Sequence, residues 1–293
     1  MAVTRKKRFG DRKEGRLLRS LPGFNKFIPY IMPTRIDACN HYEESFNVGE
    51  VDKMLRAARV RGYKGMGFLH FMIAAYIRCV SMLPGINRFI AGRRIYARDN
   101  IEIVMVVKRS LAIDATETSI KVIFEPTDTI FDVYRKMNEK INSIKVNDGN
   151  NNTEDVADAL SSLPRFLIRF AVWFLRVLDY FGLVPQKLLD ASPFHGSMII
   201  TDLGSLRIGP IYHHIYNFGT LPVFISFGAK RHAYELDRKG EMIDNKYIDC
   251  KFVLDERTVD GHYYSKFLQA LRYIFAHPEI LESPPSRVID DVD

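Results

Sequence analysis

Apolar residues recur along the chain with two different periods, and they predict helices that alternate with strands. The segment 68–82 is apolar on nearly every side, as a fully buried helix is, and Pro84 stops it. The segment 101–107 is an almost continuous run of Ile, Val and Met, which is typical of a central strand buried on both faces. Further strands are predicted over 41–48, 93–97, 119–125, 198–202, 222–228 and 247–255, and further helices over 52–60, 129–144 and 262–275. This interleaving predicts an α/β or α+β fold.

The segment 160–181 predicts an amphipathic helix that carries both arginines and aromatic residues. Arg165, Arg169 and Arg176 fall on or near one side, because they are spaced by four and seven residues. A broad second face consists of Phe166, Phe170, Trp173, Phe174 and Val177. Two interpretations stay open: the helix packs on its own domain or a sister subunit, or it lies in a membrane interface, where Arg and Trp are favoured. It is too short and too charged to span a bilayer.

Charge and cysteine content narrow the class of protein. The formal net charge is +7, and basic residues are concentrated at the N-terminus. We expect a basic arm over 1–27, one domain over 28–283 and a tail over 284–293. The arm is either solvated or attracted to an anionic partner such as a membrane surface. The sequence holds no zinc finger and no aromatic RNA-binding signature, so we expect no nucleic-acid partner. The three cysteines form no CxxC pair, and no secretory signal is visible, which favours a cytoplasmic protein.

Three segments, in order, carry a resemblance to known proteins. They are Gly196–Gly209, which contains Thr-Asp-Leu-Gly, Thr220–Ala229, which is a strand ending in glycine, and Asp255–Leu268, which begins Asp-Glu-Arg-Thr-Val-Asp-Gly. The chain thereby resembles the superfamily of chloramphenicol acetyltransferase and the catalytic domain of dihydrolipoyl acyltransferases, over about residues 30–283. The resemblance implies a two-layer sandwich in which helices flank a mixed sheet. It also implies a homotrimer with acyl-transfer sites between neighbouring subunits.

The resemblance also implies roles for individual residues. In this family a histidine takes the proton of the acceptor, a Ser or Thr of the next subunit hydrogen-bonds the oxyanion, and acyl-coenzyme A is the donor. By position, Thr201 is the oxyanion donor, Asp260 and Gly261 complete the motif, and Arg257 follows the histidine position. Glu256 occupies the histidine position itself. An early arginine of the family pairs with the motif's aspartate, and Arg35 is the candidate for that role toward Asp260.

Glutamate at position 256 changes the chemistry of the site. Histidine has an ordinary pKa of about 6.5 and suits base catalysis near neutral pH, whereas the pKa of glutamate is about 4.3. Burial raises a carboxyl pKa, so Glu256 stays a candidate base. An anion beside a developing oxyanion is repulsive, whereas the imidazolium formed in the family reaction is attractive.

Other histidines lie near the motifs. His262 directly follows Gly261, and we expect it to begin the last helix and face solvent. His213 and His214 are adjacent in an extended segment, so their side chains point to opposite sides and only one of them can line the cleft. Of the two, we take His214 as the candidate. No HxxH or HExxH spacing exists, so we expect no metal site.

Two functions stay open after the sequence. The first is a coenzyme A-dependent acyltransferase with altered or low activity, acting on a small-molecule donor and acceptor. The second is a catalytically inactive trimeric scaffold or binding module, docked on a membrane surface. No lipoyl domain is visible, so we expect a standalone trimer without a lipoyl group.

Overall fold

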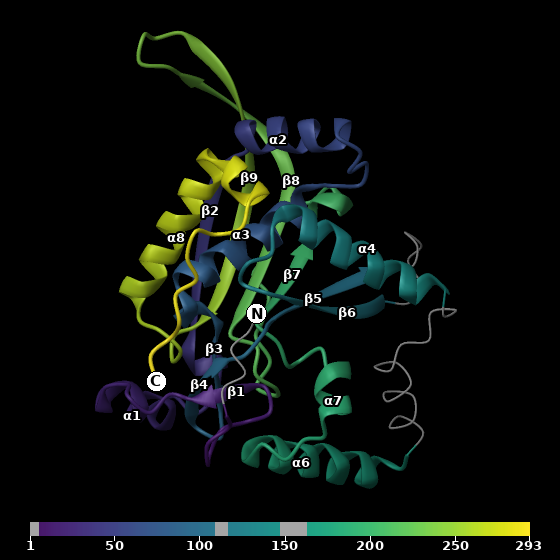
Figure 1. Cartoon of the computed structure of the whole chain (residues 1–293), viewed down its shortest axis with the longest axis vertical. Coiled ribbons are helices and arrows are strands. Elements are labelled where there is room, and N and C mark those ends of the chain that lie inside the picture. The colour runs from purple at the N-terminus through teal and green to yellow at the C-terminus, as the bar shows by residue number, and fades with distance from the viewer. Residues whose placement is uncertain (1–5, 109–116, 147–162) are drawn as a thin grey trace.

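Six strands form the main sheet of the computed structural model, which describes residues 6–108, 117–146 and 163–293 (Figure 1). In spatial order the strands are β2 (Cys39–Asn47), β9 (Met242–Asp255), β8 (Val223–Leu236), β7 (Met198–Asp202), β5 (Ile101–Lys108) and β6 (Glu117–Phe124). β7 runs parallel to both of its neighbours, and the other pairs are antiparallel. The sheet is therefore mixed, as the sequence predicts.

Helices cover one face of this sheet. They are α2 (Gly49–Val60), α3 (Phe68–Met82), α4 (Ile130–Val146) and α8 (Gly261–Ala276). Their apolar side chains share one buried cluster with alternate residues of the strands, including Phe71 of α3, Phe267 of α8 and Phe252 of β9. Most side chains of α3 are buried, because this helix is apolar on nearly every side.

The opposite face of the sheet is only partly covered, and we call it the open face. A small cluster of apolar side chains lies there, made of Val104, Ile199, Ile215, Leu221, Phe224 and Val253. Two of these residues, Ile215 and Leu221, belong to the connection between β7 and β8, which lies over the sheet in extended form. This connection places further side chains above the ends of β7 and β8.

A second, smaller sheet lies at the lower end of the molecule in Figure 1. It consists of β1 (Gly15–Leu17), β4 (Arg94–Arg98) and β3 (Arg88–Ala91) in that order. Three helices lie near the same end, namely α1 (Gly23–Ile31), α6 (Arg165–Phe181) and α7 (Gln186–Ala191). Among the described residues, no helix is long and apolar enough to cross a bilayer.

The predicted elements are confirmed where the structure describes them, but two strands are longer than expected. Of the helix predicted over 160–181, residues 160–162 lie outside the described residues. The helix predicted over 68–82 coincides with α3 at both ends. The strands predicted over 222–228 and 247–255 form only the inner halves of β8 and β9. Their outer halves make a hairpin that projects from the body (Figure 1). Its side chains are largely exposed, so no burial pattern in the sequence marks these outer strands.

The segments expected as an arm and a tail contact the rest of the fold where the structure describes them. β1 and α1 fall within 1–27, and Arg12 in the same segment is buried. Within 284–293, Asp291 accepts two hydrogen bonds from Arg88 at 2.7 and 2.6 Å, and the backbone N–H of Ile289 bonds to Ser81. Charged residues in both segments form hydrogen bonds with the rest of the fold. A high density of charge in the sequence therefore does not by itself predict that a segment is solvated.

Gly219, in the connection over the open face, allows a test of the conformation that the structure gives to this connection. Gly219 has a φ of 87°, and an added Cβ would lie 2.0 Å from the carbonyl oxygen of Phe194. Replacement by alanine combines backbone strain with a backbone clash. We expect Gly219→Ala to lower the free energy of unfolding in urea by about 1–3 kcal/mol.

Gly209 in the same connection is the matched control, because an added Cβ would meet no atom within 4 Å. Gly209→Ala should change the free energy of unfolding by roughly 0.5 kcal/mol or less. Equal effects of the two substitutions would show that this connection does not adopt the described conformation.

Candidate functional site

The motif that begins at Asp255 is built on a buried ion pair. The Asp255 carboxylate is fully buried at the end of β9. Arg257 donates to its two oxygens from Nε at 2.8 Å and from Nη2 at 2.7 Å. The Nε of Arg35 lies 3.7 Å from Asp255 Oδ2. Two buried arginines therefore share one carboxylate, and the bidentate contact fixes the direction of the chain after β9.

Arg35 connects this ion pair to neighbouring segments. Burial lowers the pKa of Arg35 to about 10, although the negative charge of Asp255 acts to raise it. The guanidinium therefore stays charged at neutral pH. It donates to the carbonyl oxygens of Tyr216 and Asn217 at 3.2 Å and of Ile90 at 3.0 Å. One side chain thus ties β9 to the connection over the open face and to β3.

Glu256 is presented to solvent by this arrangement. Its backbone N–H donates to the carbonyl of Ala38 at 2.9 Å, and its side chain is exposed. Within the part of the chain that the structure describes, the carboxylate forms no hydrogen bond and no ion pair. The site residue predicted at this position is therefore held by its backbone and free at its side chain.

Asp260 and its neighbours begin helix α8. The Asp260 carboxylate accepts a hydrogen bond from the N–H of Tyr263 at 2.9 Å, which is the ordinary geometry of a helix N-cap. Gly261 is the first residue of α8, and His262 follows it with an exposed side chain, as the sequence predicts. The pairing of Arg35 with Asp260 is wrong, because Arg35 faces Asp255 instead.

Thr201 lies near the end of β7 with an imidazole beside it. Its Oγ1 is 3.3 Å from Nε2 of His213, which comes from the connection over the open face. The ring of His213 stacks on Phe224, with centroids 4.3 Å apart and planes 7° apart. Partial burial, together with the charge of His214, holds the pKa of His213 below its ordinary value. The imidazole beside the hydroxyl is therefore neutral at physiological pH.

His214, the cleft candidate expected from the sequence, does not join Thr201. Its side chain is exposed and lies edge-on to Tyr216, with centroids 4.7 Å apart. The sequence indicates that only one histidine of the pair faces the sheet. It does not indicate which one, because the choice depends on how the irregular connection crosses the sheet.

The sheet register keeps the two halves of the predicted site apart within one chain. Thr201 is paired with Ser226 of β8, and Ser226 is paired with Lys251 of β9. Two strand spacings therefore separate Thr201 from Lys251, which is roughly 10 Å. Glu256 lies a further five residues along, roughly 16 Å beyond Lys251 if the chain stays extended. One copy of the chain cannot bring Thr201 and Glu256 into contact.

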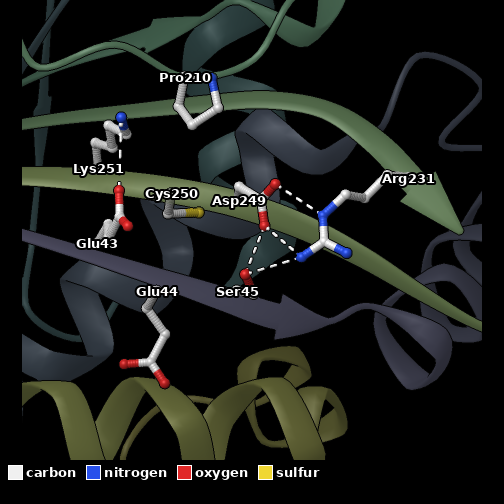
Figure 2. Close-up of a pocket in the computed structure, with 8 residues that line it drawn as sticks. All are labelled: Glu43, Glu44, Ser45, Pro210, Arg231, Asp249, Cys250 and Lys251. Carbon is white, nitrogen blue, oxygen red and sulfur yellow. Dashed lines mark hydrogen bonds and ion pairs between the residues drawn. The ribbon is translucent and has the colours of Figure 1, made fainter. Parts of the chain in front are cut away.

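A row of polar side chains continues from Thr201 across the open face. In register it consists of Thr201, Ser226, Lys251 and Glu43 of β2, so all four point to the same side of the sheet. The outer end of the row borders a hollow of about 430 Å³, lined in part by Pro210 (Figure 2).

Four of the charged groups in this hollow pair with one another, and the fifth, Glu44, accepts hydrogen bonds from Arg272 of α8. Arg231 donates to both oxygens of Asp249 at 2.9 and 3.0 Å, and Lys251 lies 3.5 Å from Glu43 (Figure 2). The hollow is therefore polar with little net charge. Among the described residues, no group of three or more His, Cys, Asp or Glu side chains is placed to hold a metal ion.

Comparison with known proteins identifies the fold. No family model matches the sequence, and no curated protein matches it. A probable dihydrolipoamide acetyltransferase from Listeria monocytogenes has a similar structure, with a TM-score of 0.56 and 14% identity, over 92% of this chain and 95% of that chain. The dihydrolipoamide acetyltransferase of Azotobacter vinelandii gives a TM-score of 0.52 and 13% identity, over 93% and 95%.

A chloramphenicol acetyltransferase also matches, with a TM-score of 0.50 and 12% identity, over 86% of this chain and 94% of that chain. The chain therefore has the chloramphenicol acetyltransferase-like fold, which the catalytic cores of dihydrolipoamide acetyltransferases also have. This confirms the fold that the sequence motifs predict. At these identities the likeness concerns the fold and not the reaction.

The two aspartates of the motif give a direct test of the site's construction. Asp255→Ala leaves two buried arginines without their carboxylate, and we expect it to lower the free energy of unfolding by about 3–5 kcal/mol. Asp260→Ala removes only a helix cap, and we expect a loss of about 1 kcal/mol. Urea unfolding followed by circular dichroism measures both. A larger loss for Asp260→Ala would contradict the assignment of Asp255 as the structural aspartate.

Proposed function

We propose that the protein transfers an acyl group from coenzyme A to a small-molecule acceptor, at a site formed between neighbouring copies of a homotrimer. The observation that supports this most is the contact of 3.3 Å between Thr201 and His213, at the position where the resemblance expects an oxyanion donor. The exposed carboxylate of Glu256 supplies the second half of the site. The fold is that of acetyltransferases, and one similar structure is the cubic core of a pyruvate dehydrogenase complex.

The Thr201–His213 pair is suited to stabilising negative charge. His213 donates its Nε2–H to Thr201 Oγ1, which leaves the threonine hydrogen free to point at the substrate. When the acceptor attacks the thioester carbonyl, the carbonyl oxygen becomes an oxyanion, and the threonine O–H donates to it. The histidine polarises this hydroxyl and so strengthens its donation.

Glu256 of the neighbouring copy acts as the base. Its carboxylate takes the proton from the acceptor thiol or hydroxyl as the acceptor sulfur or oxygen bonds to the thioester carbon. The tetrahedral intermediate then expels the coenzyme A thiolate, which recovers the proton from Glu256. The acyl group has moved, and the enzyme returns to its starting state.

The charge balance explains why we expect low activity. Once Glu256 holds the proton it is neutral, so it does not repel the oxyanion in the intermediate. It also provides no attraction, whereas a protonated histidine at the same position would. The site therefore depends on the Thr201–His213 pair for electrostatic stabilisation.

Two substitutions at position 256 separate a working site from an inactive one. Coenzyme A release from acetyl- and longer acyl-coenzyme A, with a panel of thiols, alcohols and amines, measures turnover. We expect Glu256→Gln to lower turnover at least roughly 100-fold, because the amide cannot accept the proton. Glu256→His should raise turnover near neutral pH. His213→Gln should lower it about tenfold or less, the range expected for one hydrogen bond.

His214→Gln is the matched control for His213→Gln, because its ring is adjacent in sequence and does not contact Thr201. It should leave turnover unchanged. The proposal fails if no acyl-coenzyme A gives turnover above background and calorimetry detects no coenzyme A binding. That outcome would favour the alternative of a binding module without catalysis. The observation that supports this alternative is Glu256, which stands where the family has its histidine.

A further inference from the structure

Helix α6 presents large aromatic side chains to solvent. None of its residues is buried, and Phe166, Phe170 and Trp173 are 69%, 59% and 57% exposed. The helix lies along the lower edge of the molecule, away from the main sheet (Figure 1). In the part of the chain that the structure describes, the helix packs on its own domain, as one of the interpretations from sequence has it, but this aromatic face points away from the domain.

The residues of α6 divide into three sectors around the helix axis. At about 100° per residue, Arg165, Arg169 and Arg176 share one narrow sector. An aromatic sector adjoins it, with Trp173 and Tyr180 nearest the arginines. A third sector, which includes Ile168, Leu175 and Leu178, is partly buried against the body. The helix therefore turns one apolar sector inward and exposes a second one.

The three arginines lie on the solvent-exposed side of the helix. Among the described residues, none of them forms an ion pair, and their side chains are exposed. The only acidic residue of α6 is Asp179, and its carboxylate accepts from Arg12 at 2.8 Å. The exposed part of the helix thus carries positive charge alone, next to its aromatic sector.

The C-terminal end of α6 is fixed firmly to the body. Arg12 is buried and also donates to the backbone carbonyl of Asp179 at 2.6 Å, and His195 lies 3.3 Å from the Asp179 carboxylate. Gly182 ends the helix with a left-handed φ of 73°. These contacts hold the helix in a defined orientation with its aromatic sector outward.

Helix α1 lies at the same end of the molecule as α6 and also exposes apolar side chains (Figure 1). Phe24, Phe27 and Ile31 are exposed and recur at helical spacing on one side of α1, which contains no acidic residue. The turn between β3 and β4 connects the two helices: a Cβ on Gly92 would meet the carbonyl of Tyr180 in α6. Arg93 in the same turn lies over the ring of Tyr30 in α1, at 5.7 Å.

We propose that the exposed sides of α1 and α6 form a docking surface for an anionic lipid bilayer. The aromatic residues enter the boundary between headgroups and acyl chains, while the arginines contact anionic headgroups. A second copy packed face to face is disfavoured, because neither helix carries an exposed carboxylate and such packing would bring arginines against arginines.

Vesicle binding tests this proposal without any enzymatic assay. Trp173 is the only tryptophan of the chain, so its emission reports directly on the surface. Vesicles of phosphatidylcholine and phosphatidylserine in equal parts should pellet the protein and shift this emission to the blue, and high salt should reverse both effects. Replacing the three arginines together, R165Q/R169Q/R176Q, should weaken binding on the order of 100-fold.

The control is R238Q/K239Q/K246Q, which removes the same charge from the hairpin at the other end of the molecule (Figure 1). It should bind like the wild type, because screening limits these charges to a range of about 10 Å. Two results would overturn the proposal. One is that Trp173 emits as a solvent-exposed residue, that anionic vesicles leave this emission unchanged, and that the protein does not pellet with them. The other is an emission already blue-shifted without vesicles and unaffected by them, which means that another protein surface covers α6. The vesicle experiment is independent of the proposed acyl transfer. A loss of activity in Glu256→Gln would change neither the pelleting of the protein nor the emission of Trp173.

Discussion

The register between β7, β8 and β9 is the constraint on which the functional account depends. It fixes Thr201, Ser226 and Lys251 in one row and leaves Glu256 well beyond the end of that row. Strand pairing of this kind cannot slip by one residue without turning every buried side chain to the wrong face. The hydroxyl and the carboxylate therefore belong to different places on the surface of one copy, and a shared site requires a neighbouring copy.

The buried ion pair at Asp255 complements this constraint. Arg257 and Arg35 hold the end of β9, and Arg35 also binds carbonyls of the connection that carries His213. The same buried charges thus position both halves of the proposed site. Such a pair stabilises the fold only weakly compared with apolar packing, but breaking it is costly, so it favours one local geometry. Glu256 projects from this rigid base into solvent.

Much of the fold could be predicted from the sequence, whereas less of the site could. The nearly continuous apolar composition of α3 and β5 predicts that both elements are buried. The outer half of the β8–β9 hairpin is exposed on both faces and gave no such signal. The motif located the aspartates correctly but assigned the ion pair to Asp260, because a buried partner and a helix cap look alike in sequence. The choice between His213 and His214 depends on the path of an irregular connection, which residue patterns do not determine.

Complementation between two inactive variants tests most directly whether the site lies between copies. Thr201→Val and Glu256→Gln chains are co-expressed with different tags, and assemblies that contain both are purified over both tags. In a cyclic trimer of mixed composition, one of three interfaces joins an intact Thr201 to an intact Glu256. We predict about one third of the wild-type turnover from such assemblies, although each variant alone is inactive. Turnover no higher than that of the single variants, or a protein that stays monomeric, would contradict the account.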